Sequence, residues 1–83
     1  MTVFTLYSRS YCHLCDDMLA QLQTYRSAYA FTVQVIDVDG DAELLNRYDE
    51  LVPVLIAAKP GQAARQICHY FLDTVALHNF FAA

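Results

Sequence analysis

The stretch Val3-Phe4-Thr5-Leu6-Tyr7-Ser8-Arg9-Ser10-Tyr11-Cys12-His13-Leu14-Cys15 decides the fold of this chain. Its first half is apolar and β-branched and predicts a strand over residues 2–7, covered on both faces. Apolar residues at helical spacing follow, so a Cys-x-x-Cys pair lies where a strand gives way to a helix. A helix start offers unpaired backbone N–H groups and the positive end of the helix dipole, and both stabilise a thiolate. Because the thiolate is the species that attacks a disulfide, we interpret Cys12 and Cys15 as a redox pair.

Composition limits the classes of protein to which the chain belongs. Its 83 residues suffice for one domain, residues 1–83, and 57% hydrophobic against 17% charged residues indicates a packed globular chain. The net charge of −4 and the lack of a basic stripe argue against nucleic acid as a partner. No apolar run has the roughly 20 residues of a membrane span, and the first residues lack the charged start of a signal peptide. We therefore expect no membrane partner, a cytoplasmic location, and cysteines that are catalytic or metal-binding rather than a disulfide framework.

A helix over about residues 13–28 is predicted to follow the cysteine loop. Its expected buried face comprises Leu14, Met18, Leu22, Tyr25 and Tyr29, which recur at steps of three or four. Cys15 falls on this face, whereas Cys12 precedes the helix and should be the more exposed thiol. A second strand over residues 31–37 completes a βαβ unit, whose two strands run parallel.

The acidic segment after the second predicted strand indicates a short helix. Asp41 is its predicted N-cap, and the inner face comprises Leu44, Leu45 and Tyr48. The acids from Asp37 to Glu43 also resemble a calcium loop. The glycine is misplaced, however, and the twelfth position from Asp37 is a tyrosine instead of a glutamate. We interpret these acids as a solvated helix start.

The last third of the chain predicts a hairpin and a final helix. A third strand over residues 54–58 follows Pro53, a turn spans residues 59–62, and a fourth strand covers about residues 66–71. Asp73 is the predicted N-cap of the last helix, whose inner face comprises Ala76, Leu77, Phe80 and Phe81. The element order is βαβ, α, ββ, α.

This order and the cysteine motif resemble a glutaredoxin over the whole chain. Glutaredoxins typically have Tyr-Ser/Thr-Lys, an aromatic residue and then Cys-Pro-Tyr-Cys, and residues 7–15 follow that frame. Val52-Pro53 matches the Val-Pro dipeptide whose proline is cis across the thioredoxin superfamily. The Cys-His-Leu-Cys motif followed by Asp16 and Asp17 is similar to small bacterial glutaredoxin-like proteins. The resemblance implies an α/β, thioredoxin-like fold with a four-stranded mixed sheet and three helices.

The resemblance also implies roles for residues around the cysteines. Val52 and Pro53 would shape the groove for the substrate backbone, and Arg9 and Tyr11 stand where glutaredoxins have a lysine and an aromatic residue. The glycine pair that precedes the last helix in glutaredoxins is absent here. Asp73 is then the residue that would hold the γ-glutamyl end of glutathione, and the usual Thr-Val-Pro reads Leu51-Val52-Pro53.

The environment of the cysteines bears on their reactivity. His13 replaces the glutaredoxin proline; as an imidazolium it would favour a Cys12 thiolate, or it is simply solvated. Asp16 and Asp17 suit the helix start but add negative charge near the thiol. We expect the pKa of Cys12 to lie below the free value of about 8.5, and those of Cys15 and Cys68 near or above it.

Zinc binding is the main chemical alternative for the cysteine pair. A structural zinc site needs four ligands, and only one Cys-x-x-Cys is present. Cys68 and His69 are strand neighbours that point to opposite faces, so both cannot easily reach one ion. We interpret Cys68 as a small core residue, and His69 and His78 as structural or solvated.

The sequence thus predicts a thiol–disulfide oxidoreductase in which Cys12 attacks and Cys15 resolves. A non-catalytic thioredoxin-fold adaptor and a metal or iron–sulfur carrier are the alternatives. No tightly bound cofactor is expected, and reducing equivalents would come from glutathione or a thioredoxin-type reductase. The expected partners are a disulfide-bearing protein or a glutathione mixed disulfide. We expect the protein itself to be a monomer.

Overall fold

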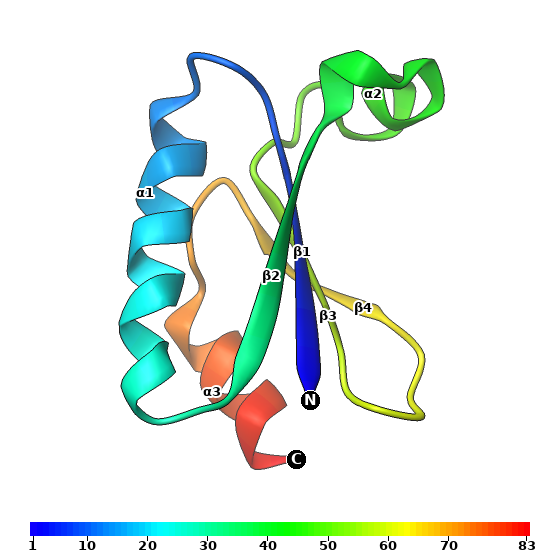
Figure 1. The fold of residues 1–83 in the computed structure, drawn as a ribbon. Helices are drawn as coiled ribbons and strands as arrows, with labels where there is room; N and C mark the ends of the chain where they lie inside the picture. Colours follow the sequence, from blue (N-terminus) through cyan, green and yellow to red (C-terminus); the bar gives the residue numbers. More distant parts are fainter.

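The strand that precedes the cysteine pair, β1 (Thr2–Ser8), lies inside a four-stranded sheet of order β2-β1-β3-β4. The computed structural model describes all residues from 1 to 83 (Figure 1). β1 runs parallel to β2 (Phe31–Asp37) and antiparallel to β3 (Val54–Ala58). β3 pairs antiparallel with the edge strand β4 (Arg65–His69). With three α-helices, this is the predicted thioredoxin-like fold, which is confirmed.

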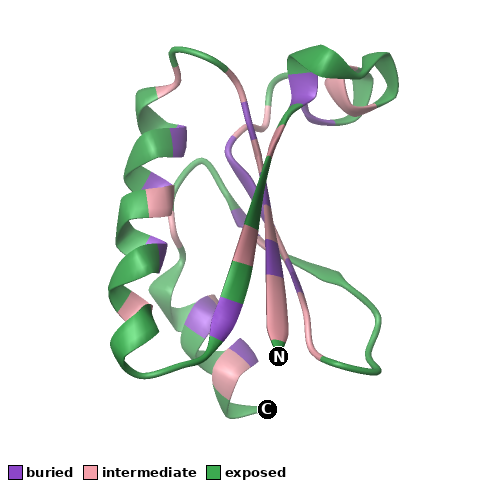
Figure 2. Cartoon of the chain, in the orientation of Figure 1, coloured by how far each residue is buried: buried purple, intermediate pink, exposed green.

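The main core lies between one face of the sheet and two helices, α1 (His13–Gln23) and α3 (Thr74–Ala82). Its residues come from the sheet and from both of these helices, and the fully buried ones include Phe4, Leu6, Met18, Leu22, Leu55 and Leu77. Figure 2 shows the buried positions of α1 on the side that faces the strands. The core therefore fixes the rotation of α1, and with it the orientation of both cysteines.

The opposite face of the sheet is covered only at one end, by α2 (Ala42–Tyr48). Tyr48 and Val54 form a small cluster there, and the ring of Tyr7 stacks on that of Tyr48 at 4.6 Å between centroids. The expectation that β1 is covered on both faces is therefore wrong for Val3 and Thr5, which stay half-exposed. Seven helical residues span only about 10 Å, whereas the seven residues of β1 extend over about 23 Å.

The first helix is shorter than its apolar pattern predicts. α1 ends at Gln23, and a 3₁₀ turn, η1 (Thr24–Ser27), replaces the expected last turn. The Thr24 hydroxyl donates to the Gln21 carbonyl at 2.6 Å, a local bond that competes with continuation of the helix. Leu14 and Tyr29 are exposed, which corrects the prediction that they lie on the buried face.

The buried stripe of α1 runs through Cys15, Met18 and Leu22, which are spaced by three and four residues. Leu14 precedes Cys15 by one residue and is therefore rotated by about 100° from it around the helix. This rotation places Leu14 at the border of the stripe, 38% exposed. The exposed side chain of Leu14 therefore adds apolar surface beside the cysteine pair.

Both predicted carboxylate caps are confirmed. Asp41 accepts from the backbone N–H groups of Glu43 and Leu44 at the start of α2, at 2.9 and 3.1 Å. Asp73 accepts from the N–H of Ala76 at the start of α3, at 2.9 Å. Each bond satisfies an N–H group that has no partner inside its helix.

The hairpin between β3 and β4 also agrees with the prediction from the sequence, except at the end of β4. The N–H of Gln62 donates to the carbonyl of Lys59 at 3.0 Å, and Gly61 supplies the positive φ of 74° that the turn requires. β4 stops at His69 instead of residue 71, because Tyr70 has a φ of 65° and leaves the extended conformation. None of the helices has both the length and the apolar character needed to cross a membrane.

Two leucines of the same helix test how the core is distributed. Leu22→Ala should lower the free energy of unfolding by about 2–5 kcal/mol, because it opens a cavity at a fully buried position. Leu14→Ala should change it by no more than about 0.5 kcal/mol, because that side chain is exposed. Urea unfolding of the two variants beside the parent measures the difference. Equal losses would show that Leu14 belongs to the core.

Candidate active site

The structure places the cysteine pair at the junction of the β1–α1 loop and α1, joined as a disulfide with a Cα–Cα distance of 5.2 Å. Cys12 is the N-cap residue, and its Sγ accepts the backbone N–H of Cys15 at 3.1 Å. A donor at the positive end of a helix stabilises negative charge on that sulfur. The predicted difference in exposure is confirmed, since Cys15 is 3% exposed and Cys12 is half-buried.

Pro53 lies at the base of the cysteine loop. Tyr7 pairs with Val54 in the β1–β3 register, which puts the residue before Val54 opposite the one after Tyr7, the buried Ser8. The Val52–Pro53 peptide bond is cis, and Pro53 is fully buried. The Pro53 carbonyl accepts the N–H of Tyr70 at 2.9 Å, which ties the end of the β4 hairpin to this end of the sheet.

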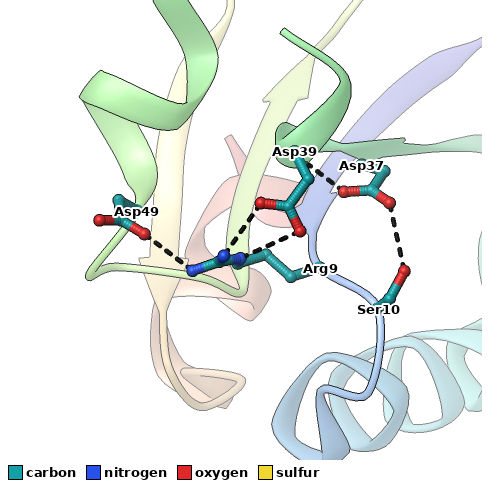
Figure 3. A network of polar contacts seen from close by, with 5 residues as sticks. All are labelled: Arg9, Ser10, Asp37, Asp39 and Asp49. Atoms are coloured by element: carbon teal, nitrogen blue, oxygen red, sulfur yellow. Dashed lines mark hydrogen bonds and ion pairs between the residues drawn. The ribbon is translucent and has the colours of Figure 1, made fainter. Parts of the chain in front are cut away.

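Arg9 leaves the cysteine loop and points to two carboxylates (Figure 3). Its guanidinium contacts Asp39 through two N–H groups, with Nη2 2.9 Å from Oδ1 and Nε 3.3 Å from Oδ2. Nη1 lies 2.7 Å from Oδ1 of Asp49. The hydrogen bond and charge of Asp39 raise the pKa of Arg9 above its ordinary value, aided by the charge of Asp49.

These ion pairs fasten the loop that carries Cys12 to the segments that precede and follow α2. Asp37 adds to the network: its Oδ2 accepts from the Ser10 hydroxyl at 3.4 Å, and its Oδ1 accepts the N–H of Asp39 at 2.9 Å. Sequence reasoning missed this use of the acids, because the partners are separated by up to 40 residues. The role of Arg9 toward a substrate stays a prediction, and a substrate carboxylate there would share the guanidinium with two aspartates.

The other predicted site residues divide into two groups. Tyr11 and His13 flank Cys12 and point to solvent; Tyr11 is fully exposed and has a φ of 57°. Asp73 instead caps α3 and lies close to Cys68.

Cys68 is buried in the main core, as expected of a small core residue. Burial raises the pKa of its thiol, and the negative charge of Asp73 adds to the rise, while the backbone hydrogen bond from Asp73 opposes it. His69, the next residue, is exposed on the other face of the strand. No three His, Cys, Asp or Glu side chains come together in a metal-binding arrangement.

A cleft of about 180 Å³ beside the cysteine pair was missed by sequence reasoning. It is lined by residues of α1 and of the β4–α3 loop, namely Leu14, Asp17, Met18, Gln21, Tyr70, Phe71 and Leu72. Besides its bond to Pro53, Tyr70 donates its hydroxyl to the Glu50 carbonyl at 2.5 Å. The signal in the sequence was the adjacent aromatic pair Tyr70-Phe71 before a helix cap. The sequence pattern instead predicts the end of a strand at this pair.

The fold and the site define a thioredoxin-fold domain that carries a close Cys12–Cys15 pair. The profile of the glutaredoxin-like domain family (DUF836) matches residues 3–82, and the chain belongs to this family. The resemblance noted from the sequence is thereby confirmed.

Solved structures agree with this assignment. The solution NMR structure of protein Ne2328 from Nitrosomonas europaea is 34% identical, with a TM-score of 0.83 over 95% of this chain and 89% of that one. The X-ray structure of protein XcR50 from X. campestris is 32% identical, with a TM-score of 0.61 over 96% and 97%. Oxidised mitochondrial thioredoxin 3 from Saccharomyces cerevisiae, at 17% identity, shares the fold with a TM-score of 0.68 over 98% and 76%. Comparison with curated protein sequences finds no significant match.

In the oxidised protein Cys68 is the only free thiol, which allows its titration to be followed alone. We expect iodoacetamide to modify it more slowly in the folded than in the urea-unfolded protein, with a midpoint above the free value of about 8.5. Mass spectrometry across a pH series measures the rates. Coinciding profiles for the folded and unfolded protein would contradict the raised pKa.

The same shift has a consequence for stability. Because the folded protein keeps the Cys68 proton at a pH where the unfolded chain loses it, stability declines as the pH rises above about 8.5. The free energy of unfolding of the oxidised parent should therefore fall more steeply toward pH 10 than that of oxidised Cys68→Ala. Parallel curves for the two proteins would show that Cys68 titrates alike in both states.

Tyr11 offers a test of backbone strain beside Cys12. Its side chain is fully exposed, and its positive φ costs a non-glycine residue about 1–2 kcal/mol. Tyr11→Gly should therefore raise the free energy of unfolding by up to about 1 kcal/mol, after the entropy cost of glycine. His13→Gly, at the first position of α1, should lower it by about 0.5–1 kcal/mol. A loss in both variants would contradict strain at Tyr11.

Proposed function

We propose that this protein is a thiol–disulfide oxidoreductase, with Cys12 as the nucleophile and Cys15 as the resolving thiol. One observation carries the proposal: the Sγ of Cys12 accepts the N–H of Cys15 at 3.1 Å at the start of α1, while Cys15 itself is buried. The arrangement favours a thiolate on the sulfur that a substrate reaches first. The same arrangement keeps the Sγ of Cys15 within bonding distance of the Sγ of Cys12.

The chemistry proceeds in two exchanges from the reduced dithiol. The Cys12 thiolate attacks one sulfur of a substrate disulfide, forms a mixed disulfide with it, and releases the other substrate sulfur as a thiolate. Cys15 then loses its proton to the released thiolate or to water and attacks the Sγ of Cys12. The second substrate thiolate leaves and takes up a proton, and the Cys12–Cys15 disulfide remains, as in the structure. Two electrons pass from the dithiol to the substrate, and the two product thiolates take up one proton from Cys15 and one from water.

Four of the remaining site residues serve substrate binding in this proposal. Val52 and Pro53 present the backbone at the base of the cysteine loop, and Tyr11 and His13 flank the sulfur of Cys12. Arg9 and Asp73 are already engaged with Asp39, Asp49 and the start of α3. They act first as positioning residues for the cysteine loop and for α3.

The reaction needs no tightly bound cofactor, because a thiol reductant restores the dithiol. That reductant is glutathione or the dithiol of a thioredoxin-type reductase, and the protein acts as a monomer in the reducing environment of the cytoplasm. The partner is a protein disulfide or a mixed disulfide.

Trapping of the mixed disulfide tests the two cysteine roles. Incubated with 2-hydroxyethyl disulfide, reduced Cys15→Ser should accumulate an adduct on Cys12, because no thiol remains to resolve it. Cys12→Ser should form no adduct at a comparable rate, and Cys68→Ser should cycle to the internal disulfide like the parent. Peptide mapping by mass spectrometry locates each adduct.

The competing classes predict other outcomes of this experiment. A non-catalytic adaptor would give no adduct in any variant, and a metal or iron–sulfur carrier would purify with an ion that both cysteine variants lose. An adduct mainly on Cys15 of Cys12→Ser would reverse the assigned roles.

A further inference from the structure

We infer that the cleft between α1 and the β4–α3 loop binds an apolar side chain of a disulfide-bearing polypeptide, with a basic residue of the same polypeptide paired to Asp17. The inference rests on the proposed function and names the class of substrate for the same site. It selects a polypeptide disulfide over glutathione.

One wall of the cleft starts next to the redox pair. Leu14 lies between the two cysteines in the sequence and forms one wall, followed on α1 by Asp17 and Met18. The opposite wall begins with Tyr70, whose N–H is bonded to the carbonyl of Pro53. A polypeptide whose disulfide meets Cys12 is therefore within reach of this cleft.

The walls offer apolar surface that the protein leaves unused. Phe71 is 67% exposed, and Leu14 and Tyr70 are each 38% exposed. Tyr11, fully exposed, adds a further ring next to Cys12. Exposed apolar side chains gathered around a cleft mark a binding surface, since burial against a partner removes them from water.

The size of the cleft matches one large side chain. Its volume of about 180 Å³ exceeds the roughly 150 Å³ of an apolar protein cavity that takes up benzene. A phenyl ring or a leucine side chain therefore fits. Glutathione has no such group, since its side chains are a carboxylate-bearing γ-glutamyl arm and a thiol.

Charge also separates the two kinds of substrate. The chain has a net charge of −4, and Asp17 lines the cleft with no ion-pair partner. Arg9, the cation nearest the cysteines in sequence, is paired with both Asp39 and Asp49. Glutathione is an anion at neutral pH and meets no free arginine or lysine here. A lysine or arginine of a substrate can instead form an ion pair with the unpaired carboxylate of Asp17.

The Tyr70 backbone fixes the far wall of the cleft. A positive φ is an outlier for a bulky residue, and here two hydrogen bonds, to the carbonyls of Pro53 and Glu50, hold it. The turn at Tyr70 ends β4 and directs the following residues, Phe71 and Leu72, along α1. The cleft is thus built by the same contacts that attach the β4–α3 loop to Pro53.

Single-turnover oxidation of the reduced protein tests the inference without any electron donor. The probes are four disulfides: a peptide disulfide whose cysteine has phenylalanine before it and lysine after it, its alanine-for-phenylalanine analogue, its glutamate-for-lysine analogue, and glutathione disulfide. We expect the second-order rate constant to fall about tenfold on loss of the phenylalanine and about threefold on the charge reversal. Glutathione disulfide should react more slowly than the first peptide.

Matched variants assign these preferences to the cleft. Phe71→Ala should reduce the preference for phenylalanine over alanine to about twofold or threefold. Val75→Ala, an equally exposed apolar residue outside the cleft, should leave that ratio intact. Asp17→Asn should abolish the preference for lysine over glutamate, and Asp16→Asn, one residue earlier on the helix, should keep most of it.

The outcomes separate this inference from the proposed function. Equal rate constants for all three peptides, a faster reaction with glutathione disulfide, or equal effects of Phe71→Ala and Val75→Ala would overturn the cleft as the specificity site. In each case the redox function stands if 2-hydroxyethyl disulfide still oxidises the parent protein through Cys12. If that small disulfide leaves Cys12 and Cys15 reduced, the proposed function fails, and the inference fails with it.

Discussion

Hydrogen bonding of β1 on both of its edges is the constraint on which the site depends. The strand is in register with β2 up to Ser8 and Asp37, and with β3 at Tyr7 and Val54. Its C-terminal end therefore lies between the end of one neighbour and the start of the other. Whatever follows Ser8 must meet the segment after Asp37 and the segment before Val54. The cysteine loop leaves the sheet there, so its neighbours are set by strand pairing.

Arg9, in the loop that follows β1, forms ion pairs with both neighbouring segments. Asp39 follows β2 and Asp49 precedes β3, and the guanidinium bridges the two. Each ion pair is exposed and contributes little stability by itself, since water and salt screen it. Their combined effect is geometric: they hold the loop before Cys12 against both neighbouring segments.

Packing of α1 on the sheet creates the difference between the two sulfurs. The stripe of Cys15, Met18 and Leu22 faces the core, and Cys12, at the N-cap, stays outside it. The same rotation of the helix exposes Leu14 beside the sulfurs and opens the cleft toward Tyr70. The difference in exposure between the two sulfurs and the position of the cleft thus follow from a single orientation. The two non-glycine residues with positive φ, Tyr11 and Tyr70, both lie at this end of the molecule.

The sequence by itself determined the order of elements, the helix caps at Asp41 and Asp73, and the relative exposure of Cys12 and Cys15, and the resemblance of that order and of the cysteine motif to glutaredoxins implied the fold. These features depend on local patterns, namely apolar periodicity, cap chemistry and the strand-to-helix position of the motif. Only the tertiary structure decided that Arg9 pairs with Asp39 and Asp49 and that Leu14 joins Tyr70 and Phe71 in a cleft. It also decided that α2 covers only one end of the sheet face opposite to the main core. Each of these features joins residues that are far apart in the chain. Strand register and helix rotation bring these residues together, and both are set by the packed core, so no local sequence pattern predicts them.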